Sequence, residues 1–214
     1  MISPESYYEE NLKGKTAEQI MTAIRGLKNE IGHLKNALED PNYDFYDHVC
    51  PDEHTRLSCC FEYLERAKLA LIEAGGVYTP SKAEQKAKEF DESIPLINKI
   101  VFSIGGYFEG FETKTITFDE NNVCMDVEHS LLPKPSAHRI EGDHPMTKAE
   151  FISGLYELHI GEWRRRYYDN DIDDGTQWDL EIYYSDDRKP IKIFGSNEYP
   201  YNFNKLKDLF GCEK

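Results

Sequence analysis

The chain has 214 residues, of which 39% are apolar and 13% aromatic, and its formal net charge at pH 7 is −15. This length is enough to bury a core, in one domain or in two small ones. Acidic residues outnumber basic ones in both halves, so a phosphate backbone would be repelled and direct binding of nucleic acid is not expected. No apolar run approaches the roughly 20 residues that span a bilayer, so we expect no membrane partner.

The first residues and the cysteines bear on the cellular compartment. Residues 1–15 lack the basic and apolar segments of a signal peptide, and we therefore expect a cytoplasmic protein. The cysteine count is odd and no C-x-x-C pair occurs, so neither a disulfide framework nor a zinc ribbon is expected. We expect reduced thiols and no cofactor. The cysteines are Cys50, Cys59, Cys60, Cys124 and Cys212.

The first predicted helix follows Thr16, which forms a capping-box pattern with Gln19. Apolar residues from Ile20 to Leu38 recur at spacings of three and four, and Pro41 ends the pattern. This stripe fits a helix that packs within its own bundle. It also fits the seam of a homodimer, because fewer than three heptads do not distinguish the two arrangements.

Two further helices are predicted before Pro95. The second runs from about Asp52 to Ala74 and ends at Gly75-Gly76, since glycine permits a left-handed cap. The third begins at another capping-box pattern, Ser81-Lys82-Ala83-Glu84, and ends near Asp91. A bundle of this size can bury a shared core or present a face to a partner.

Pro95 marks a change of period from helix to strand, and we place the domain boundary there. Residues 99–118 predict two strands, and residues 123–132 predict a third. A helix, a hairpin and a closing helix follow. This order predicts an α+β fold with helices on one face of an antiparallel sheet. The predicted parts are a region of three helices at 1–94 and an α+β domain at 95–214.

Residues 174–211 carry the clearest structural signal. Apolar and polar residues alternate over 177–184, which predicts a strand with one buried face. A polar turn and a returning strand follow, so this stretch reads as a hairpin. Pro200 suits the first turn of a closing helix, and Gly211 suits its C-terminal cap.

Two glycine-containing segments are candidates for the recognition of a partner. The run Gly105-Gly106-Tyr107-Phe108-Glu109-Gly110 places aromatic residues between glycines, which suit a tight turn. The loop 195–201 places backbone N–H groups beside aromatic rings. The alternative is that these rings pack in the core or at its rim. The candidate binding residues are Gly105, Gly106, Tyr107, Phe108, Gly110, Trp178, Ser196, Asn197 and Tyr199.

The glycine-rich turn at 105–110 and the order of elements after Pro95 resemble the emfourin family of small protein inhibitors of thermolysin-like metallopeptidases. That family is marked by a Gly-Gly-Phe-Ala-Gly-like turn between its first strands. In this chain the turn is one residue longer and carries Glu109. The resemblance covers the part after Pro95, and the helices before it have no counterpart. It implies an inhibitor that inserts this turn into a protease cleft.

A metal-dependent hydrolase is the enzymatic alternative. His159 and Glu162 lie three apart in a helix predicted over 148–166, so both would share one side. A catalytic metal needs two or three protein ligands and an open position for water. No nucleophile elbow, phosphate-binding loop or H-E-x-x-H pattern occurs, and we expect no catalytic residue. The further candidate ligands are Glu128, His129, His138 and His144.

Two charged clusters each have two interpretations. Arg164-Arg165-Arg166 would lie in the last turn of the predicted helix, where positive charge complements the helix dipole; the alternative is an anion site. Asp169, Asp171 and Asp173 match positions one, three and five of an EF-hand loop. The sixth and twelfth residues do not match, so we expect a solvated turn, with calcium as the alternative.

The sequence therefore favours a non-catalytic module that binds a protein or another ligand, with another protein as the expected partner. In this interpretation, Tyr107, Phe108 and Tyr199 bury apolar area while backbone groups fix the orientation. The acidic composition allows a further hypothesis, namely a decoy that blocks the basic groove of a partner.

Overall fold

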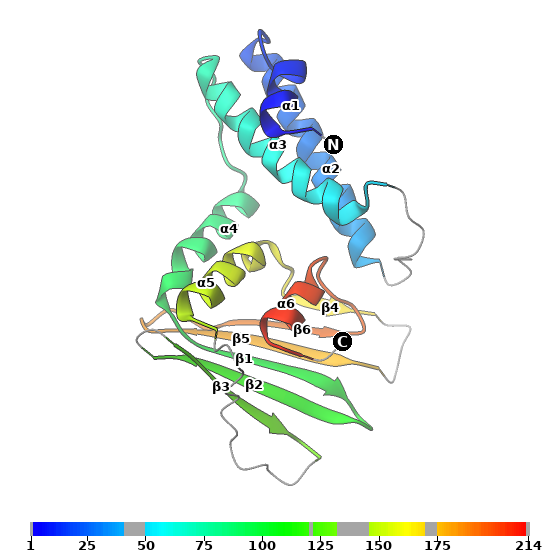
Figure 1. The fold of residues 1–214 in the computed structure, drawn as a ribbon, viewed down its shortest axis with the longest axis vertical. Coiled ribbons are helices and arrows are strands. Elements are labelled where there is room, and N and C mark those ends of the chain that lie inside the picture. Colours follow the sequence, from blue (N-terminus) through cyan, green and yellow to red (C-terminus); the bar gives the residue numbers. More distant parts are fainter. Residues whose placement is uncertain (1, 41–49, 120–121, 132–145, 170–174, 213–214) are drawn as a thin grey trace. The chain divides into compact units, whose positions relative to one another are not determined.

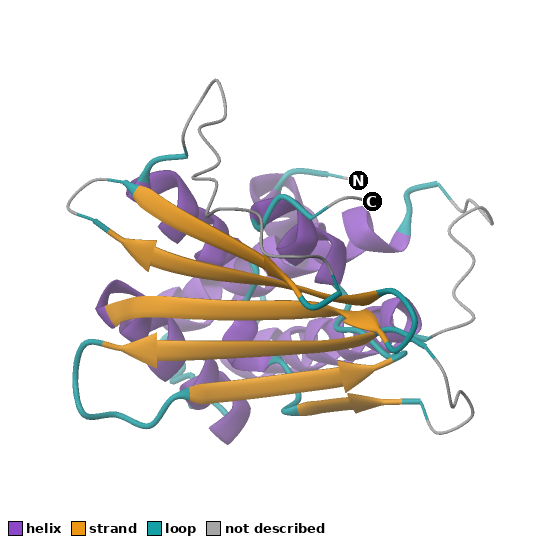
Figure 2. Ribbon diagram, turned by 90° about the horizontal axis from the view of Figure 1, so that it is seen from below, coloured by secondary structure: helices purple, strands orange, loops and turns teal. Residues whose placement is uncertain are grey.

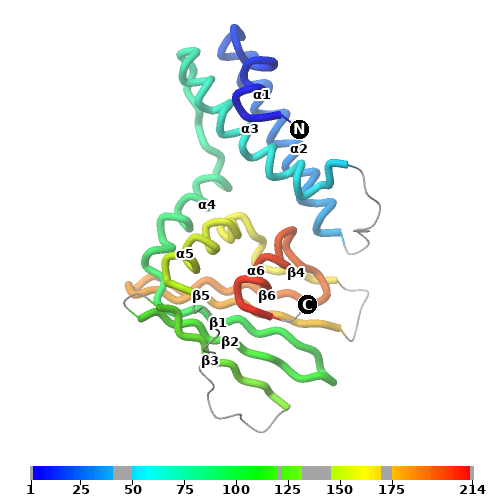
Figure 3. The backbone as a smooth tube through the Cα atoms, in the orientation of Figure 1, coloured from blue at the N-terminus to red at the C-terminus, as the bar shows by residue number. Residues whose placement is uncertain are grey.

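The computed structural model describes residues 2–40, 50–119, 122–131, 146–169 and 175–212. The chain forms two compact units, Met1–Pro80 and Ser81–Lys214 (Figures 1 and 3). No helix in the described ranges combines the length and the apolar character that crossing a membrane requires.

In its described residues, the first unit contains three helices, α1 (Pro4–Asn11), α2 (Ala17–Glu39) and α3 (Glu53–Glu73). The capping box predicted at Thr16 and Gln19 is present at the start of α2. The apolar stripe of α2 is buried where this helix packs along α3, so most of it is covered within the chain. The buried members of the stripe are Ile20, Ile24, Leu27, Ile31 and Leu34.

Sequence reasoning missed helix α1. Its start signals are ordinary ones: Ser3 caps it by accepting a hydrogen bond from the Ser6 N–H, and Pro4 occupies the first turn. Its apolar pattern is weak because no residue of the helix is buried. A ring contact attaches it to α3, since Tyr7 stacks on Tyr63 with ring centroids 4.3 Å apart.

Helix α4 (Lys82–Ser93) belongs to the second unit, although the sequence analysis assigned it to the helical region. The division lies between Pro80 and Ser81 instead of at Pro95. The predicted capping box at Ser81 and Glu84 is present, so the start of the helix is where the sequence placed it. The physical reason for the different boundary is tertiary: α4 packs against the short 3₁₀ helix η2 (Ile160–Glu162), a segment distant in sequence.

The second unit is built on one six-stranded sheet with the order β3-β2-β1-β5-β6-β4 (Figure 2). Its neighbours are antiparallel except β4 and β6, which are parallel. Strand β4 was not predicted, because three residues are too few to show an alternation. The strands are β1 (Ile97–Gly106), β2 (Gly110–Phe118), β3 (Val123–His129), β4 (Arg166–Tyr168), β5 (Gln177–Tyr184) and β6 (Ile191–Ser196).

Helices α5 (Lys148–Glu157) and α6 (Phe203–Leu209) lie on one face of this sheet (Figure 1). Aromatic contacts join the layers: Phe102 of β1 packs against Phe203 and Phe210, and Phe118 of β2 packs against Phe151 of α5. The short helix η1 (Ile94–Leu96) leads from α4 into β1. The predicted α+β fold is confirmed.

Helix α5 ends at Glu157, well before the predicted end near residue 166. His159 adopts a left-handed conformation with φ of 47°, which turns the chain out of the helix and into η2. Leu158 and Trp163 are both buried, as their spacing suggested. A turn followed by a 3₁₀ helix buries both side chains. The spacing of apolar residues does not distinguish this arrangement from a continuous helix.

The sheet contains a buried lysine on its helix-covered side. Lys114 of β2 is 4% exposed, and its Nζ donates hydrogen bonds to the carbonyls of Phe210 and Gly211 at 3.1 and 2.7 Å. The Glu112 carboxylate lies 3.0 Å away. The ammonium group therefore satisfies carbonyls at the C-terminal end of α6, where a positive charge is favourable.

Lys114→Met is expected to lower the free energy of unfolding of the second unit by about 2 kcal/mol, because the buried Phe210 carbonyl and the partly buried Gly211 carbonyl lose a charged donor. Urea unfolding followed by tryptophan fluorescence measures this directly, since both tryptophans, Trp163 and Trp178, lie in that unit. Lys205→Met removes a charge from the exposed side of α6 and is the control. Equal stability of the two variants would contradict the capping role.

Candidate functional site

The hairpin between β1 and β2 ends in a three-residue turn formed by Tyr107, Phe108 and Glu109. The last pair of the ladder joins Gly106 to Gly110, whose φ of 80° favours glycine. A Cβ at Gly105 would lie 2.0 Å from the Gly110 carbonyl oxygen. The glycines therefore permit a close strand crossing that places the turn at the end of the sheet.

The two aromatic rings of this turn are exposed to an unusual degree. Tyr107 is 83% exposed and Phe108 is 77% exposed, and their rings meet edge to face with centroids 5.2 Å apart. We call this pair the aromatic tip. Leu131, also exposed, lies beside Gly110, where a Cβ would come within 2.7 Å of its Cγ. Neighbouring exposed apolar side chains are typical of a contact surface.

The structure brings both predicted recognition segments to the same end of the sheet. Gly105 pairs with Gln177 at the start of β5, and Gln177 pairs with Ser196 at the end of β6. Gly175 lies between the two segments: its carbonyl approaches Gly106, and a Cβ on it would collide with the Asn197 amide. The turn 105–110 and the loop 195–201 are therefore neighbours across the beginning of β5.

A small pocket lies between the aromatic tip and the start of β5 and encloses about 160 Å³. Backbone of two glycines forms part of its wall, so main-chain groups are accessible beside the rings. This volume is below the 300–1,000 Å³ typical of ligand pockets, which favours a single side chain as an occupant. The lining residues are Gly106, Tyr107, Phe108, Glu109, Gly175 and Thr176.

Trp178, predicted as a binding residue, is fully buried instead. Its indole lies beneath Gly195, and its Nε1 donates a 3.0 Å hydrogen bond to the Glu198 carbonyl. Tyr199 is partly buried against Phe203, with ring centroids 4.8 Å apart. These two rings support the loop 195–201 from below, as the core-packing alternative proposed.

Glu198 ties the same loop to β4. Its carboxylate accepts hydrogen bonds from the Arg164 guanidinium and from the Tyr168 N–H, each at 2.7 Å. The expected role of Arg164-Arg165-Arg166 at a helix end is therefore wrong, because α5 ends earlier. Arg164 pairs with Glu198, and Arg166 lies over the Phe194 ring at 5.4 Å.

The metal-site hypothesis gains no support from the described residues. His159 and Glu162 do not share an α-helix, since His159 precedes η2 and Glu162 is its last residue. No group of three or more His, Cys, Asp or Glu is placed to hold a metal within the described ranges. His129 lies on β3, 3.9 Å from the Glu112 carboxylate, and all five cysteines are free thiols. His138 and His144, and most of the aspartate-rich loop 169–175, lie outside the described residues.

Sequence reasoning missed a second pocket, which lies between α4, η2 and the β5–β6 hairpin. Its cationic residues come from three distant segments, so no local motif marks them. The one signal was the arginine cluster, whose anion-site alternative concerned Arg165 among others. The cations that line it are Lys86, Arg165, Arg188 and Lys189.

Comparisons of the chain with protein-family models, with curated proteins and with solved structures found no match. The resemblance to the emfourins accordingly stays a prediction.

Proposed function

We propose that this protein is a non-catalytic recognition module that inserts the aromatic tip, Tyr107 and Phe108, into an apolar recess of another protein. The observation that carries the proposal is the exposure of two adjacent aromatic rings, 83% and 77%, at the end of a hairpin. Exposure of these rings to water is unfavourable. Burial of one large apolar side chain in an interface contributes about 1.5–3 kcal/mol to the free energy of binding.

The backbone beneath the aromatic tip favours tight binding. The Gly106–Gly110 pair and the close approach of the strands at Gly105 fix both ends of the turn. The Ser130 hydroxyl also accepts a hydrogen bond from the Phe111 N–H at 2.8 Å. A pre-organised turn loses little conformational entropy on binding, so more of the apolar gain contributes to affinity.

The resemblance to the emfourins suggests one class of partner, a thermolysin-like metallopeptidase whose cleft receives the turn. Glu109 distinguishes this turn from the family pattern and adds a carboxylate beside the rings. Thermolysin is therefore the first probe, with inhibition of peptide hydrolysis as the readout. Absence of inhibition would remove this partner class and leave recognition of a different protein as the proposal.

The Tyr107→Ala/Phe108→Ala double variant is expected to weaken binding to the partner about 100-fold or more, because aromatic anchors dominate interfaces. The partner is captured from a lysate of the source organism with the wild-type chain, identified, purified and titrated by calorimetry. Tyr168→Ala is the matched control, since Tyr168 is an exposed aromatic residue of β4 in the same unit. Equal affinity of the wild type and the double variant would contradict the proposal.

The net charge of −15 supports an acidic decoy as a second candidate. The two candidates differ in their response to salt. Exposed ion pairs weaken when salt shortens the screening length. Binding through the buried aromatic tip does not depend on ion pairs, so salt does not weaken it in this way. Repeating the titration at high ionic strength therefore distinguishes a charge-driven complex from one that the rings hold together.

A further inference from the structure

The pocket between α4, η2 and the β5–β6 hairpin lies at the opposite end of β5 and β6 from the aromatic tip. Tyr184 ends β5 and Ile191 begins β6 at this pocket, whereas Gln177 and Ser196 lie at the other end. It encloses about 180 Å³. All its lining residues belong to the second unit, and none was part of the predicted recognition surface.

The charge of this pocket opposes the charge of the whole chain. Four of its lining residues are cationic, Lys86, Arg165, Arg188 and Lys189, and Glu89 is the acidic one among the lining residues. The chain as a whole carries −15. A local positive cluster on a strongly acidic protein raises the local concentration of anions at one place.

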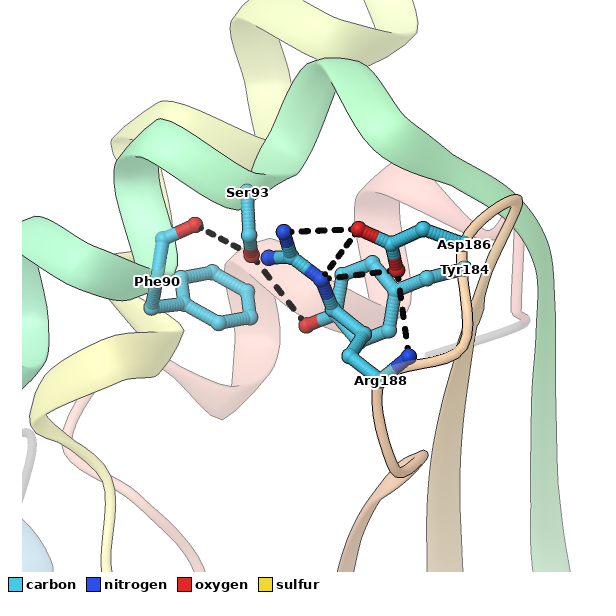
Figure 4. A network of polar contacts seen from close by, with 5 residues as sticks. All are labelled: Phe90, Ser93, Tyr184, Asp186 and Arg188. Carbon is cyan, nitrogen blue, oxygen red and sulfur yellow. Dashed lines mark hydrogen bonds and ion pairs between the residues drawn. The ribbon is translucent and has the colours of Figure 1, made fainter.

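Three of the four cations, Lys86, Arg165 and Lys189, have no acidic partner among the residues that the structure describes. Arg188 is neutralised by Asp186, whose carboxylate accepts from its Nε at 2.8 Å (Figure 4). Lys86 and the Arg165 guanidinium have no ion pair or side-chain hydrogen bond with any residue that the structure describes. Burial lowers the pKa of Lys86, and the positive charge of Arg165 lowers it further. A bound anion would relieve this repulsion.

The floor of the pocket is apolar and aromatic. Phe90, Ile160 and Tyr184 are buried there. The Ser93 hydroxyl donates to the Phe90 carbonyl at 2.7 Å and lies 3.2 Å from the Tyr184 hydroxyl (Figure 4). These bonds hold the Tyr184 side chain in place. The Arg188 guanidinium lies over the Tyr184 ring, 5.0 Å from its centroid. The pocket thus combines buried apolar and aromatic side chains with positive charge.

We propose that this pocket binds a small organic anion, a phosphate or carboxylate group attached to an apolar body. Lys86 and Arg165 hold the anionic group, and Phe90 and Tyr184 contact the apolar part. The volume of about 180 Å³ is below the range typical of drug-sized ligands and excludes a dinucleotide. It suits a ligand of the size of a substituted benzene ring, because an apolar cavity of about 150 Å³ binds benzene. The site is independent of the aromatic tip.

The test is calorimetric titration of the full-length protein at fixed ionic strength with phenyl phosphate, benzoate, inorganic phosphate and phenol. We expect saturable binding of phenyl phosphate or benzoate with one site per chain, the two probes deciding between phosphate and carboxylate. Inorganic phosphate and phenol, each with half of the required chemistry, are expected to bind at least about tenfold more weakly. Equal binding of inorganic phosphate and phenyl phosphate would overturn the role of the apolar floor.

Lys86→Gln/Arg165→Gln is expected to weaken binding of the tighter probe by about tenfold or more. The control is Lys88→Gln/Arg166→Gln, which removes the same charge from neighbouring exposed residues outside the pocket. All four side chains are exposed, and unfolding curves verify that each variant remains folded. Absence of saturable binding to the wild type, or an equal loss in both double variants, would overturn the proposal.

Discussion

Trp178→Ala is expected to lower the free energy of unfolding of the second unit by about 4 kcal/mol, as large aromatic-to-alanine changes do in cores. Trp178 is fully buried, and its ring packs against Trp163, Tyr167 and Phe203. The variant leaves a cavity among these rings. It also removes the donor to the Glu198 carbonyl, so a partly buried acceptor loses its partner.

Urea unfolding followed by circular dichroism measures this effect without relying on the deleted fluorophore. Trp178→Phe keeps most of the ring and loses the hydrogen bond, so it is expected to cost about 1–2 kcal/mol. Phe194→Ala is the control, since Phe194 is a more exposed aromatic residue of the neighbouring β6. A Trp178→Ala variant as stable as the Phe194→Ala variant would mean that Trp178 is a surface residue, as a binding role would require.

Gly161→Ala is expected to lower the free energy of unfolding of the second unit by about 3 kcal/mol, which is at the upper end of the usual effect of overpacking. A Cβ on Gly161 would lie 2.7 Å from the Cα of Ala87 and 2.8 Å from the Cβ of Phe90. The first of these atoms is backbone, so α4 would have to move away from η2. Because Phe90 forms part of the floor of the cationic pocket, the same variant is expected to weaken anion binding there.

The control is the same chemical change at Gly32 in α2, where a Cβ would meet nothing within 4 Å. There, alanine is expected to stabilise the helix by up to about 1 kcal/mol, because glycine is the poorer helix former. If α4 packs closely on η2, chemical unfolding will show a lower free energy of unfolding for Gly161→Ala and a higher one for Gly32→Ala. A neutral Gly161→Ala would show that α4 is not held against η2.

Local signals predicted most of the elements, because each signal lies within a few residues of what it controls. The capping boxes at Thr16, Ser81 and Thr147 all begin helices. The alternation over 177–184 predicted β5 and its buried face, and Gly211 follows α6 with φ of 60°. Propensity, period and cap agreed at these positions, and such agreement is typical of a well-specified fold.

The predictions that failed depended on contacts between distant residues. Helix α4 has one apolar face, and its own sequence does not specify whether α3 or η2 covers that face. The deciding contact is Gly161 against Ala87, far apart along the chain. Likewise, a left-handed His159 ends the path of α5, although the burial of Leu158 and Trp163 fits a continuous helix.

The residues of the aromatic tip could be predicted from the sequence. Their position beside the loop 195–201 could not. The glycine-flanked aromatic residues at 105–110 marked the tip from sequence alone. Its proximity to Ser196 and Asn197 follows from the strand order β1-β5-β6, which no local pattern encodes. Trp178 was a candidate binding residue with core packing as the alternative, and its alternation with Leu180 and Ile182 already put it on the buried face of β5.

The most direct test of the recognition proposal is photo-crosslinking at the aromatic tip in living cells. Phe108→p-benzoylphenylalanine places the reactive group at the exposed end of the hairpin, and Phe194→p-benzoylphenylalanine places it on β6 as the control. We predict a discrete crosslinked complex with one protein from position 108 and none from position 194, abolished by adding Tyr107→Ala. No crosslink at position 108, or the same products from both positions, would contradict the claim that the aromatic tip recognises a partner.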